Sequence, residues 1–450
     1  MSPVLTAQAH PLEQMIQQRT ARLGVVGLGY VGLPLAMLYS RAGFRLTGFD
    51  VDPSKVKNLN AGRSYIQRIL PEEIQALREQ GFEATSDYSD IRDMDAVMIC
   101  VPTPLDEHQG PDMRYIEQTA RALAPYLRAG QLIILESTTY PGTTNEVLIP
   151  ALEEGNPDGL RCYRDGADES RCFHVAYSPE REDPGNATVD RQDIPKVVGS
   201  GSQLSTELAG SLYNTVFRRI VPVSSASAAE MTKLLENIYR CINIALVNEL
   251  KLLCLRMGLD IWEIIDAAAT KPFGFQPFYP GPGLGGHCIP IDPFYLSWKA
   301  KEVDFSTRFI DLAGEINTSM PYHVIDSVAT ALNERGKPLK GSNILVLGLA
   351  YKKDIDDLRE SPSLTLIEVL KKRGANVSYN DPYFPTVGRG RHYDLNMTCR
   401  SLDDLASYDC VLIATDHSDY DFEAIAQQAQ LVVDTRNATA GLNRDNIVRC

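Results

Sequence analysis

The chain has 450 residues, 44% of them hydrophobic, and a formal net charge of −14 at pH 7. At roughly 150 residues per domain, this length predicts about three domains. The acidic balance and the lack of any lysine or arginine run argue against a nucleic-acid-binding protein.

Nine cysteines at irregular spacing argue against a disulfide framework, and because they include no CxxC pair we expect no metal site. Cys100 and Cys410 lie in apolar, strand-like runs and are predicted to be buried. The first 20 residues are polar, and no stretch approaches about 18 apolar residues. We therefore expect a cytoplasmic protein that does not bind membranes.

The first half of the chain alternates strand-like and helix-like segments. Apolar runs predict four strands and helical patterns lie between them: strands at 22–27, 44–50, 95–101 and 131–136, with helices at 36–41 and 115–126. Nearly continuous apolar runs are typical of strands buried on both faces of a parallel sheet. The alternation predicts a doubly wound α/β domain. A polar, glycine-rich stretch at 153–171 is predicted to be a surface loop.

The pattern becomes helical between residues 226 and 269. Gly258 is expected to end a long helix, and Asp260 to cap a second helix over 261–269. The long helix suits a spacer, a dimer interface or a buried core helix equally well. A second α/β unit follows, with strands predicted at 342–348, 375–380, 410–414 and 430–434. It lacks the full GxGxxG motif, so we expect no second pyrophosphate site in the usual place.

The segment Gly27-Leu-Gly-Tyr-Val-Gly32 follows a predicted strand and opens a helix. In dinucleotide-binding motifs the first glycine makes the tight turn, the second admits the pyrophosphate and the third lets helix and strand pack closely. Asp50 ends the next strand, where a carboxylate accepts hydrogen bonds from a ribose and repels a 2′-phosphate. The motif predicts NAD rather than NADP, although such a turn can also serve packing alone.

Cys288 follows a glycine run in Pro282-Gly-Leu-Gly-Gly-His-Cys-Ile-Pro-Ile-Asp-Pro293 and precedes Asp292 by four residues. A lone cysteine is usually an inert core residue. The glycines and the carboxylate favour a nucleophilic thiolate here. His287 is a weaker candidate for its base, because neighbours in a chain often point apart.

Other candidate site residues lie on one helix and at strand ends. Lys233 and Asn237 are spaced i and i+4 on the long helix, which places them on one face. Such a face is usually solvated, but a lysine in an apolar cleft can act as a general base. Glu180, Thr103 and the Ser137-Thr138 pair follow predicted strands, where parallel sheets bind ligands.

Together these motifs resemble the UDP-sugar 6-dehydrogenase family, which includes UDP-glucose dehydrogenase. The resemblance covers nearly the whole chain after about residue 20, and it rests on several motifs in the same order: GLGYVG, Val101-Pro-Thr-Pro, Glu136-Ser-Thr-Thr, Ser178-Pro-Glu, Glu230-Met-Thr-Lys-Leu-Leu-Glu-Asn, Gly283-Leu-Gly-Gly-His-Cys, and Gly348-Leu-Ala-Tyr-Lys-Lys-Asp through Arg359-Glu-Ser.

The family's architecture implies two Rossmann-like doubly wound parallel-sheet domains joined by a long central helix. We predict an NAD-binding domain over 1–215, a central helical dimerisation domain over 216–318 and a UDP-binding domain over 319–450. The expected assembly is a homodimer or a higher homo-oligomer.

The resemblance also implies a reaction and its residues. A C6 alcohol is oxidised to a carboxylate with two NAD and one water, through a thiohemiacetal and a thioester on Cys288. Lys233 assists proton removal, Asn237 and Asp292 position a water, Glu180 is the acid/base of hydrolysis and Thr138 supports the water. The implied cofactor contacts are Gly27, Gly29, Tyr30, Val31, Gly32, Asp50, Lys55, Thr103, Ser137 and Arg359, and the implied substrate contacts are Phe278, Tyr279, Gly285, Lys352 and Arg436.

Two departures from the glucose enzymes bear on the sugar. The loop after Ser178-Pro-Glu reads Arg181-Glu-Asp-Pro-Gly-Asn186, and the stretch Lys271-Pro-Phe-Gly-Phe-Gln-Pro-Phe-Tyr279 is aromatic and lacks an arginine. Both resemble the branch acting on UDP-N-acetylhexosamines, and the first is most similar to UDP-N-acetylglucosamine 6-dehydrogenases. The product is expected to feed a surface polysaccharide.

Alternatives remain at this point. Within the family they are UDP-glucose, UDP-N-acetylgalactosamine and UDP-N-acetylmannosamine as substrates. Outside it they are a two-electron hydroxyacid dehydrogenase, which needs no cysteine, and a non-catalytic NAD-binding redox sensor.

Overall fold

The computed structural model describes residues 10–66, 69–106, 110–182, 190–286, 289–390 and 393–450. The chain divides into two compact units, Met1–Leu235 and Glu236–Cys450, and each is considered by itself. Among the described residues, no helix is long and apolar enough to cross a membrane.

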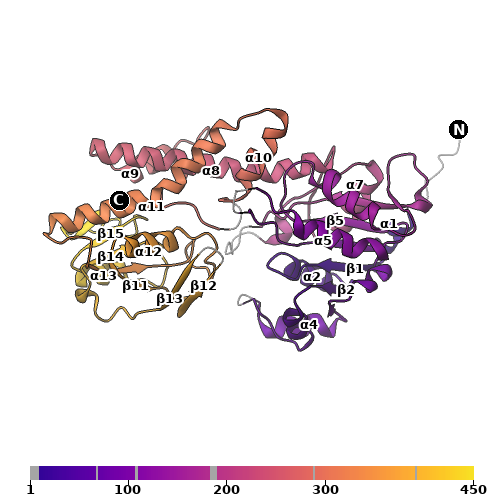
Figure 1. Ribbon diagram of the computed structural model, residues 1–450, viewed down its shortest axis with the longest axis horizontal. Coiled ribbons are helices and arrows are strands. Elements are labelled where there is room, and N and C mark those ends of the chain that lie inside the picture. Colours follow the sequence, from indigo (N-terminus) through magenta and orange to yellow (C-terminus); the bar gives the residue numbers. More distant parts are fainter. Residues whose placement is uncertain (1–9, 67–68, 107–109, 183–189, 287–288, 391–392) are drawn as a thin grey trace. The chain divides into compact units, whose positions relative to one another are not determined.

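The first unit is built on one large sheet (Figure 1). Its strands follow the order β3-β2-β1-β4-β5-β7-β8-β9, and β6 pairs with β7. All neighbours are parallel except β7 and β8. The strands are β1 (Arg22–Val26), β2 (Arg45–Phe49), β3 (Glu83–Thr85), β4 (Ala96–Ile99), β5 (Leu132–Leu135), β6 (Arg161–Cys162), β7 (Cys172–Tyr177), β8 (Lys196–Ser200) and β9 (Ile220–Val223).

Helices cover both faces of this sheet, and each face has its own apolar core. Val25 and Met98 contribute to one core, while their neighbours Val26 and Ile99 contribute to the other. This is why the strands read as continuous apolar runs. The helices are α1 (Pro11–Gln17), α2 (Gly32–Arg41), α3 (Pro53–Asn60), α4 (Pro71–Glu79), α5 (Arg114–Leu123), α6 (Ile149–Glu154) and α7 (Gln203–Tyr213).

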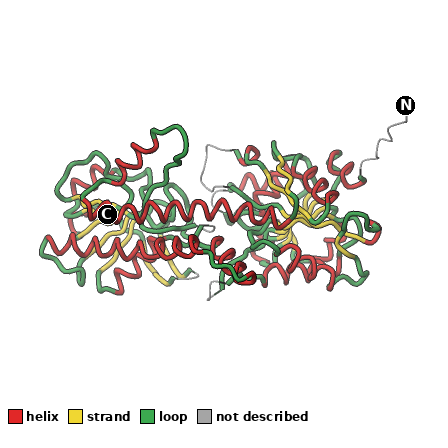
Figure 2. The backbone as a smooth tube through the Cα atoms, turned by 90° about the horizontal axis from the view of Figure 1, so that it is seen from above, coloured by secondary structure: helices red, strands yellow, loops and turns green. Residues whose placement is uncertain are grey.

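The second unit has a smaller parallel sheet of order β11-β10-β14-β15-β16, together with the antiparallel pair β12-β13. In each unit the strands gather between helices (Figure 2). The strands are β10 (Asn343–Leu347), β11 (Asn376–Asn380), β12 (Thr386–Arg389), β13 (Asp394–Thr398), β14 (Cys410–Ile413), β15 (Val432–Asp434) and β16 (Ile447–Arg449). The helices are α9 (Ile261–Ala269), α10 (Asp292–Ala300), α11 (Arg308–Glu334), α12 (Pro362–Lys372) and α13 (Phe422–Gln428).

One long helix, α8 (Ala226–Met257), begins in the first unit and continues into the second. It ends at Met257, just before Gly258, whose φ of 68° lies in the left-handed region. Asp260 then caps α9 by accepting the Trp262 N–H at 2.9 Å. The predicted fold class of two doubly wound parallel sheets and a long central helix is confirmed.

Two local predictions are wrong. The stretch 153–171 is not simply a surface loop, because β6 pairs with β7 and Asn156 is buried. The Asn156 side chain bonds the Leu160 N–H and the Ala124 carbonyl, so it fixes this polar stretch to the domain. Cys410 is fully buried as predicted, whereas Cys100 is partly exposed at the end of β4. All eight described cysteines are free thiols.

Candidate active site

The glycine turn between β1 and α2 has the geometry expected of a dinucleotide site. Gly27 has a φ of 89°, and a Cβ there would lie 2.7 Å from the Cys100 carbonyl oxygen. A Cβ on Gly32 would collide with the Gly27 carbonyl. Gly29 faces open space, with no atom within 4 Å of a Cβ built there. The first and third glycines therefore serve the turn and its packing, and the second leaves room for a ligand.

Asp50, the predicted ribose ligand, lies beside this turn at the end of β2. Its carboxylate accepts the Leu28 N–H at 2.9 Å and the Lys55 ammonium at 3.0 Å, and the side chain is buried. Asp50 and Lys55, both predicted to contact the cofactor, therefore hold each other in place. Tyr30 and Val31 lie at the start of α2, and the Tyr30 ring is largely exposed. The open space over Gly29 and this carboxylate fit NAD.

The loops after β4 and β5 are tied together at the same edge of the sheet. The Thr103 hydroxyl donates to the Thr138 carbonyl at 2.7 Å, and the Ser137 hydroxyl donates to the Val101 carbonyl at 2.7 Å. Lys233, from α8, donates its ammonium to the Thr138 hydroxyl at 2.5 Å. Lys233 is only 7% exposed, so the solvated-face alternative for this residue is wrong.

Glu180 follows β7 at this edge and lies next to a buried ion pair that the sequence analysis missed. Lys196 donates to Glu136 at 2.6 Å and lies 3.6 Å from Glu180. Burial raises the pKa of Glu180, but Lys196, Arg191 and Lys233 outweigh it and hold this pKa below its ordinary value. The sequence signal that could have revealed this ion pair is Lys196, a charged residue that opens the buried strand β8.

In the second unit, the two candidate site residues Asn237 and Asp292 are in contact. The Asn237 amide donates to the Asp292 carboxylate at 2.6 Å, and both side chains are buried. Arg240 donates to the Asn237 amide oxygen at 2.7 Å and so orients that amide. Asp292 is the first residue of α10. Cys288 and His287 lie outside the described residues.

The glycines before Cys288 are explained in part by packing. A Cβ on Gly285 would lie 2.5 Å from the Tyr351 side chain, and Gly286 has a φ of 90° and donates to the Arg359 carbonyl at 2.9 Å. Lys352, the residue after Tyr351 in the sequence, is half-buried. The glycine run therefore lets the loop lie close against the segment 351–362.

The other predicted substrate and cofactor contacts of this unit have local partners. Phe278 packs against a small core of α8 and α9, and the Tyr279 hydroxyl donates to Asp266 at 2.9 Å. The Arg436 guanidinium donates to the Ala414 carbonyl at 2.9 Å, and Arg359 forms a paired hydrogen bond with Asp357. Their roles toward ligands stay predictions.

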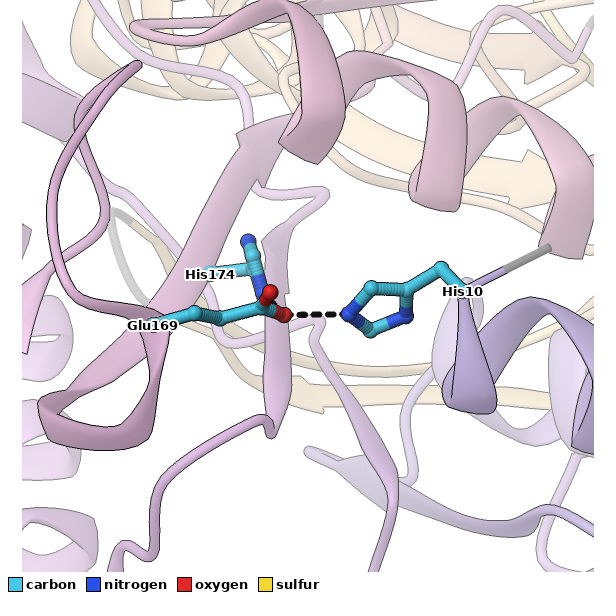
Figure 3. Close-up of side chains that lie close together, drawn as sticks. All are labelled: His10, Glu169 and His174. Carbon is cyan, nitrogen blue, oxygen red and sulfur yellow. Dashed lines mark hydrogen bonds and ion pairs between the residues drawn. The ribbon is translucent and has the colours of Figure 1, made fainter. Parts of the chain in front are cut away.

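Away from these groups, His10, Glu169 and His174 converge in the first unit (Figure 3). The His10 Nδ1 accepts the Leu12 N–H at 3.2 Å and thereby caps α1, so the His10 proton lies on Nε2 and is donated to Glu169. A metal bound at Nε2 requires that proton on Nδ1 instead. The contacts therefore favour a hydrogen-bonded cluster rather than a metal centre. This cluster holds α1 against the sheet.

Comparisons with known proteins identify the family. Three domain profiles of the UDP-glucose/GDP-mannose dehydrogenase family match the chain: the NAD binding domain at 21–217, the central domain at 227–319 and the UDP binding domain at 345–441. The UDP-N-acetyl-D-mannosamine dehydrogenase of Pyrococcus horikoshii is 35% identical over 425 residues, 92% of this chain and 95% of that protein. The UDP-N-acetyl-D-glucosamine 6-dehydrogenase of Pseudomonas aeruginosa is 32% identical over 400 residues, 89% and 91% of the two chains.

Solved structures agree with this result. The structure of the Pyrococcus horikoshii UDP-D-ManNAc dehydrogenase superposes with a TM-score of 0.83 at 33% identity, covering 95% of this chain and 98% of that one. The profiles, the relatives and the NAD-binding turn therefore agree. The chain belongs to the UDP-glucose/GDP-mannose dehydrogenase family and is an NAD-dependent UDP-sugar dehydrogenase, an oxidoreductase.

Proposed function

We propose that this enzyme oxidises the C6 alcohol of a UDP-N-acetylhexosamine, namely UDP-N-acetylglucosamine, to the uronic acid. The observation that carries the proposal is the position of Lys233. Its buried ammonium meets Thr138 at the sheet edge where the glycine turn also lies, within reach of the charge of Glu180. In this proposal Lys233 is the proton-transfer group, held at the edge where parallel sheets bind ligands.

The proposed reaction consists of two oxidations and one hydrolysis. NAD supplies a hydride acceptor for each of two oxidations. The alcohol first loses a hydride and a proton, and the Cys288 thiolate then forms a C–S bond to the aldehyde carbon. Loss of a second hydride from that carbon leaves a thioester. Water then adds to the thioester carbon and breaks the C–S bond, which gives the carboxylate, returns the thiolate and releases two protons.

The described residues have matching roles in this proposal. Lys233 assists removal of the proton of the C6 hydroxyl and stabilises the negative charge that develops on its oxygen. Glu180 accepts a proton from the hydrolytic water, which Thr138 helps to hold. Asn237 and Asp292 position water beside Cys288, and Asp292 can take its proton. Lys352 and Arg436 bind the UDP group, and Phe278, Tyr279 and Gly285 line the sugar site.

The choice of sugar is tested with a panel of UDP-sugars. By name, the relatives include a UDP-N-acetyl-D-mannosamine dehydrogenase, a UDP-N-acetyl-D-glucosamine 6-dehydrogenase and an NDP-N-acetyl-D-galactosaminuronic acid dehydrogenase. We expect kcat/KM, followed by NADH formation, to be highest for UDP-N-acetylglucosamine and to exceed that for UDP-glucose by about tenfold or more, because the acetamido group fills an aromatic site. If kcat/KM is highest for UDP-glucose, the N-acetylhexosamine assignment is wrong. If it is highest for another N-acetylhexosamine epimer, the class assignment holds and only the choice of N-acetylglucosamine is wrong.

We also propose that the enzyme is a homodimer formed through α8, acting in the cytoplasm where thiols stay reduced. Exposed apolar side chains Tyr239, Leu246, Leu250, Leu253 and Met257 follow one face of α8. At 3.6 residues per turn they lie within about 60° of one another. A stripe of this kind suits pairing with the same helix of a second copy, since a C2 interface uses one patch twice.

Charge placed on the stripe is expected to separate the subunits. We predict that Leu246→Glu/Leu253→Glu sediments as a monomer at concentrations where the unmodified enzyme is a dimer. Leu255→Glu is the matched control, because Leu255 is also exposed on α8 but lies on the opposite face. Sedimentation of the unmodified enzyme as a monomer, or equal effects of both substitutions, contradicts this interface.

A further inference from the structure

Three charged side chains form a row inside the first unit: Glu136 after β5, Lys196 at the start of β8 and Glu180 after β7. The Lys196 ammonium donates to the Glu136 carboxylate at 2.6 Å and to the Pro179 carbonyl at 3.1 Å. It lies 3.6 Å from the Glu180 carboxylate. The side chains of Glu136 and Lys196 are 0% and 4% exposed, and that of Glu180 is 11% exposed.

The lysine cannot move freely between the two carboxylates. Glu136 is held by the Tyr213 hydroxyl, which donates to its second oxygen. The Lys196 ammonium also lies 5.0 Å from the centre of the Tyr213 ring and 5.5 Å from that of Phe217. These contacts surround the ammonium with fixed partners.

The two distances differ in a way that matters for chemistry. At 2.6 Å Lys196 makes a charge-assisted hydrogen bond with Glu136, whereas at 3.6 Å it acts on Glu180 only through its charge. One Glu180 oxygen accepts the N–H groups of Arg181 and Glu182, at 3.0 and 2.9 Å, so the carboxylate is fixed in orientation. The oxygen nearest Lys196 is stabilised as an anion without accepting a hydrogen bond from that lysine.

We propose that Lys196, restrained by the buried Glu136 carboxylate, is the positioning residue that keeps Glu180 ionised and oriented to take the proton of the hydrolytic water. The proposal rests on the hydrolytic role of Glu180 in the proposed function. Glu136 thus acts through Lys196: it draws the ammonium back, so that Lys196 does not form a direct hydrogen bond that would make Glu180 a poorer base.

The surrounding charges agree with this assignment. Glu180 faces Lys196 on β8, Arg191 just before it, Lys233 on α8 and Glu136 after β5. Burial raises the pKa of Glu180, but the cations together lower it below the ordinary value. Burial also raises the pKa of Glu136, against the opposing effect of Lys196. Tyr39, Cys100 and Tyr213 also face Glu136, and burial raises the pKa of each, so they stay neutral.

The test separates the two oxidations from hydrolysis by rapid mixing with UDP-N-acetylglucosamine. In Lys196→Met we expect an undiminished burst of two NADH per active site, followed by steady-state turnover reduced about 10²-fold. The thioester on the protein should accumulate and appear by intact mass. The acidic limb of the kcat–pH profile should move up by about 1–3 pH units, because a cation within a few ångströms of Glu180 is lost.

Matched variants show whether the effect is electrostatic or merely structural. Lys196→Arg keeps the charge and should restore most of the pH profile. Glu136→Gln/Lys196→Met removes the whole ion pair, which avoids a lone buried charge, and should keep the shifted profile of Lys196→Met. Glu136→Gln alone frees the ammonium to approach Glu180 and should move the acidic limb down instead.

Two results overturn the proposal. If Glu180→Gln slows hydrolysis but Lys196→Met leaves both turnover and the acidic limb unchanged, Lys196 does not position Glu180. The same holds if Lys196→Met reduces the NADH burst and the steady state equally, since a general structural defect then explains the loss. If Glu180→Gln itself hydrolyses the thioester at the native rate, the role of Glu180 in the proposed function fails as well.

Discussion

The Cys288→Ser variant is expected to lose uronic acid formation by about 10³-fold or more. A serine hydroxyl is not ionised at neutral pH, and it cannot replace a thiolate in attacking the aldehyde carbon. The rate is measured by chromatographic separation of the UDP-uronic acid from UDP-N-acetylglucosamine after incubation with NAD.

Cys399→Ser is the matched control for this variant. Cys399 is a partly exposed free thiol whose sulfur contacts backbone groups of Asp381 and Arg400 in the second unit. It should form acid at close to the native rate. If Cys288→Ser also kept that rate, the covalent route through this sulfur would be wrong.

Lys233→Met is expected to lower kcat by about 10²–10⁴-fold, the range that general acid–base groups supply. Methionine fills the space of the lysine stem but can neither accept a proton nor donate a hydrogen bond to the Thr138 hydroxyl. Steady-state NADH formation measures the loss. Lys372→Met, on the exposed part of α12, is the control and should leave kcat unchanged.

Lys233→Arg separates the two parts of the proposed role. Arginine keeps the positive charge but does not release its proton at neutral pH. A variant as slow as Lys233→Met supports proton transfer, whereas recovery to within a few-fold of the native rate shows that charge stabilisation is sufficient. Native turnover in Lys233→Met contradicts any catalytic role for this residue.

Much of the fold was predictable from local patterns. The apolar runs gave strands β1, β2, β4 and β5 of the first sheet and β10, β11, β14 and β15 of the second, whereas β3, β6, β8, β9 and β16 were not predicted. Asp260 marked the start of α9 because an N-cap carboxylate is a local signal. The glycine turn was equally readable, since Gly27 and Gly32 meet strict steric limits. The stretch 153–171 was misjudged because its polar composition did not reveal that Asn156 satisfies buried backbone groups.

The candidate site was predictable only where a motif carried it. Lys233, Asn237 and Asp292 were found through spacing and resemblance, and the structure brings Asn237 and Asp292 together. The Glu136–Lys196 pair joins residues 60 positions apart in the sequence, so no local pattern could connect them. The packing role of the glycines before Cys288 was missed for the same reason. Their packing partner, Tyr351, lies far along the chain.

The most direct test of a four-electron oxidation is the yield of NADH from a limiting amount of UDP-N-acetylglucosamine. With excess NAD and the reaction run to completion, the account predicts two NADH for each sugar consumed, with all of the sugar recovered as the uronic acid. A yield of one NADH per sugar, with the product left as the aldehyde, would contradict it.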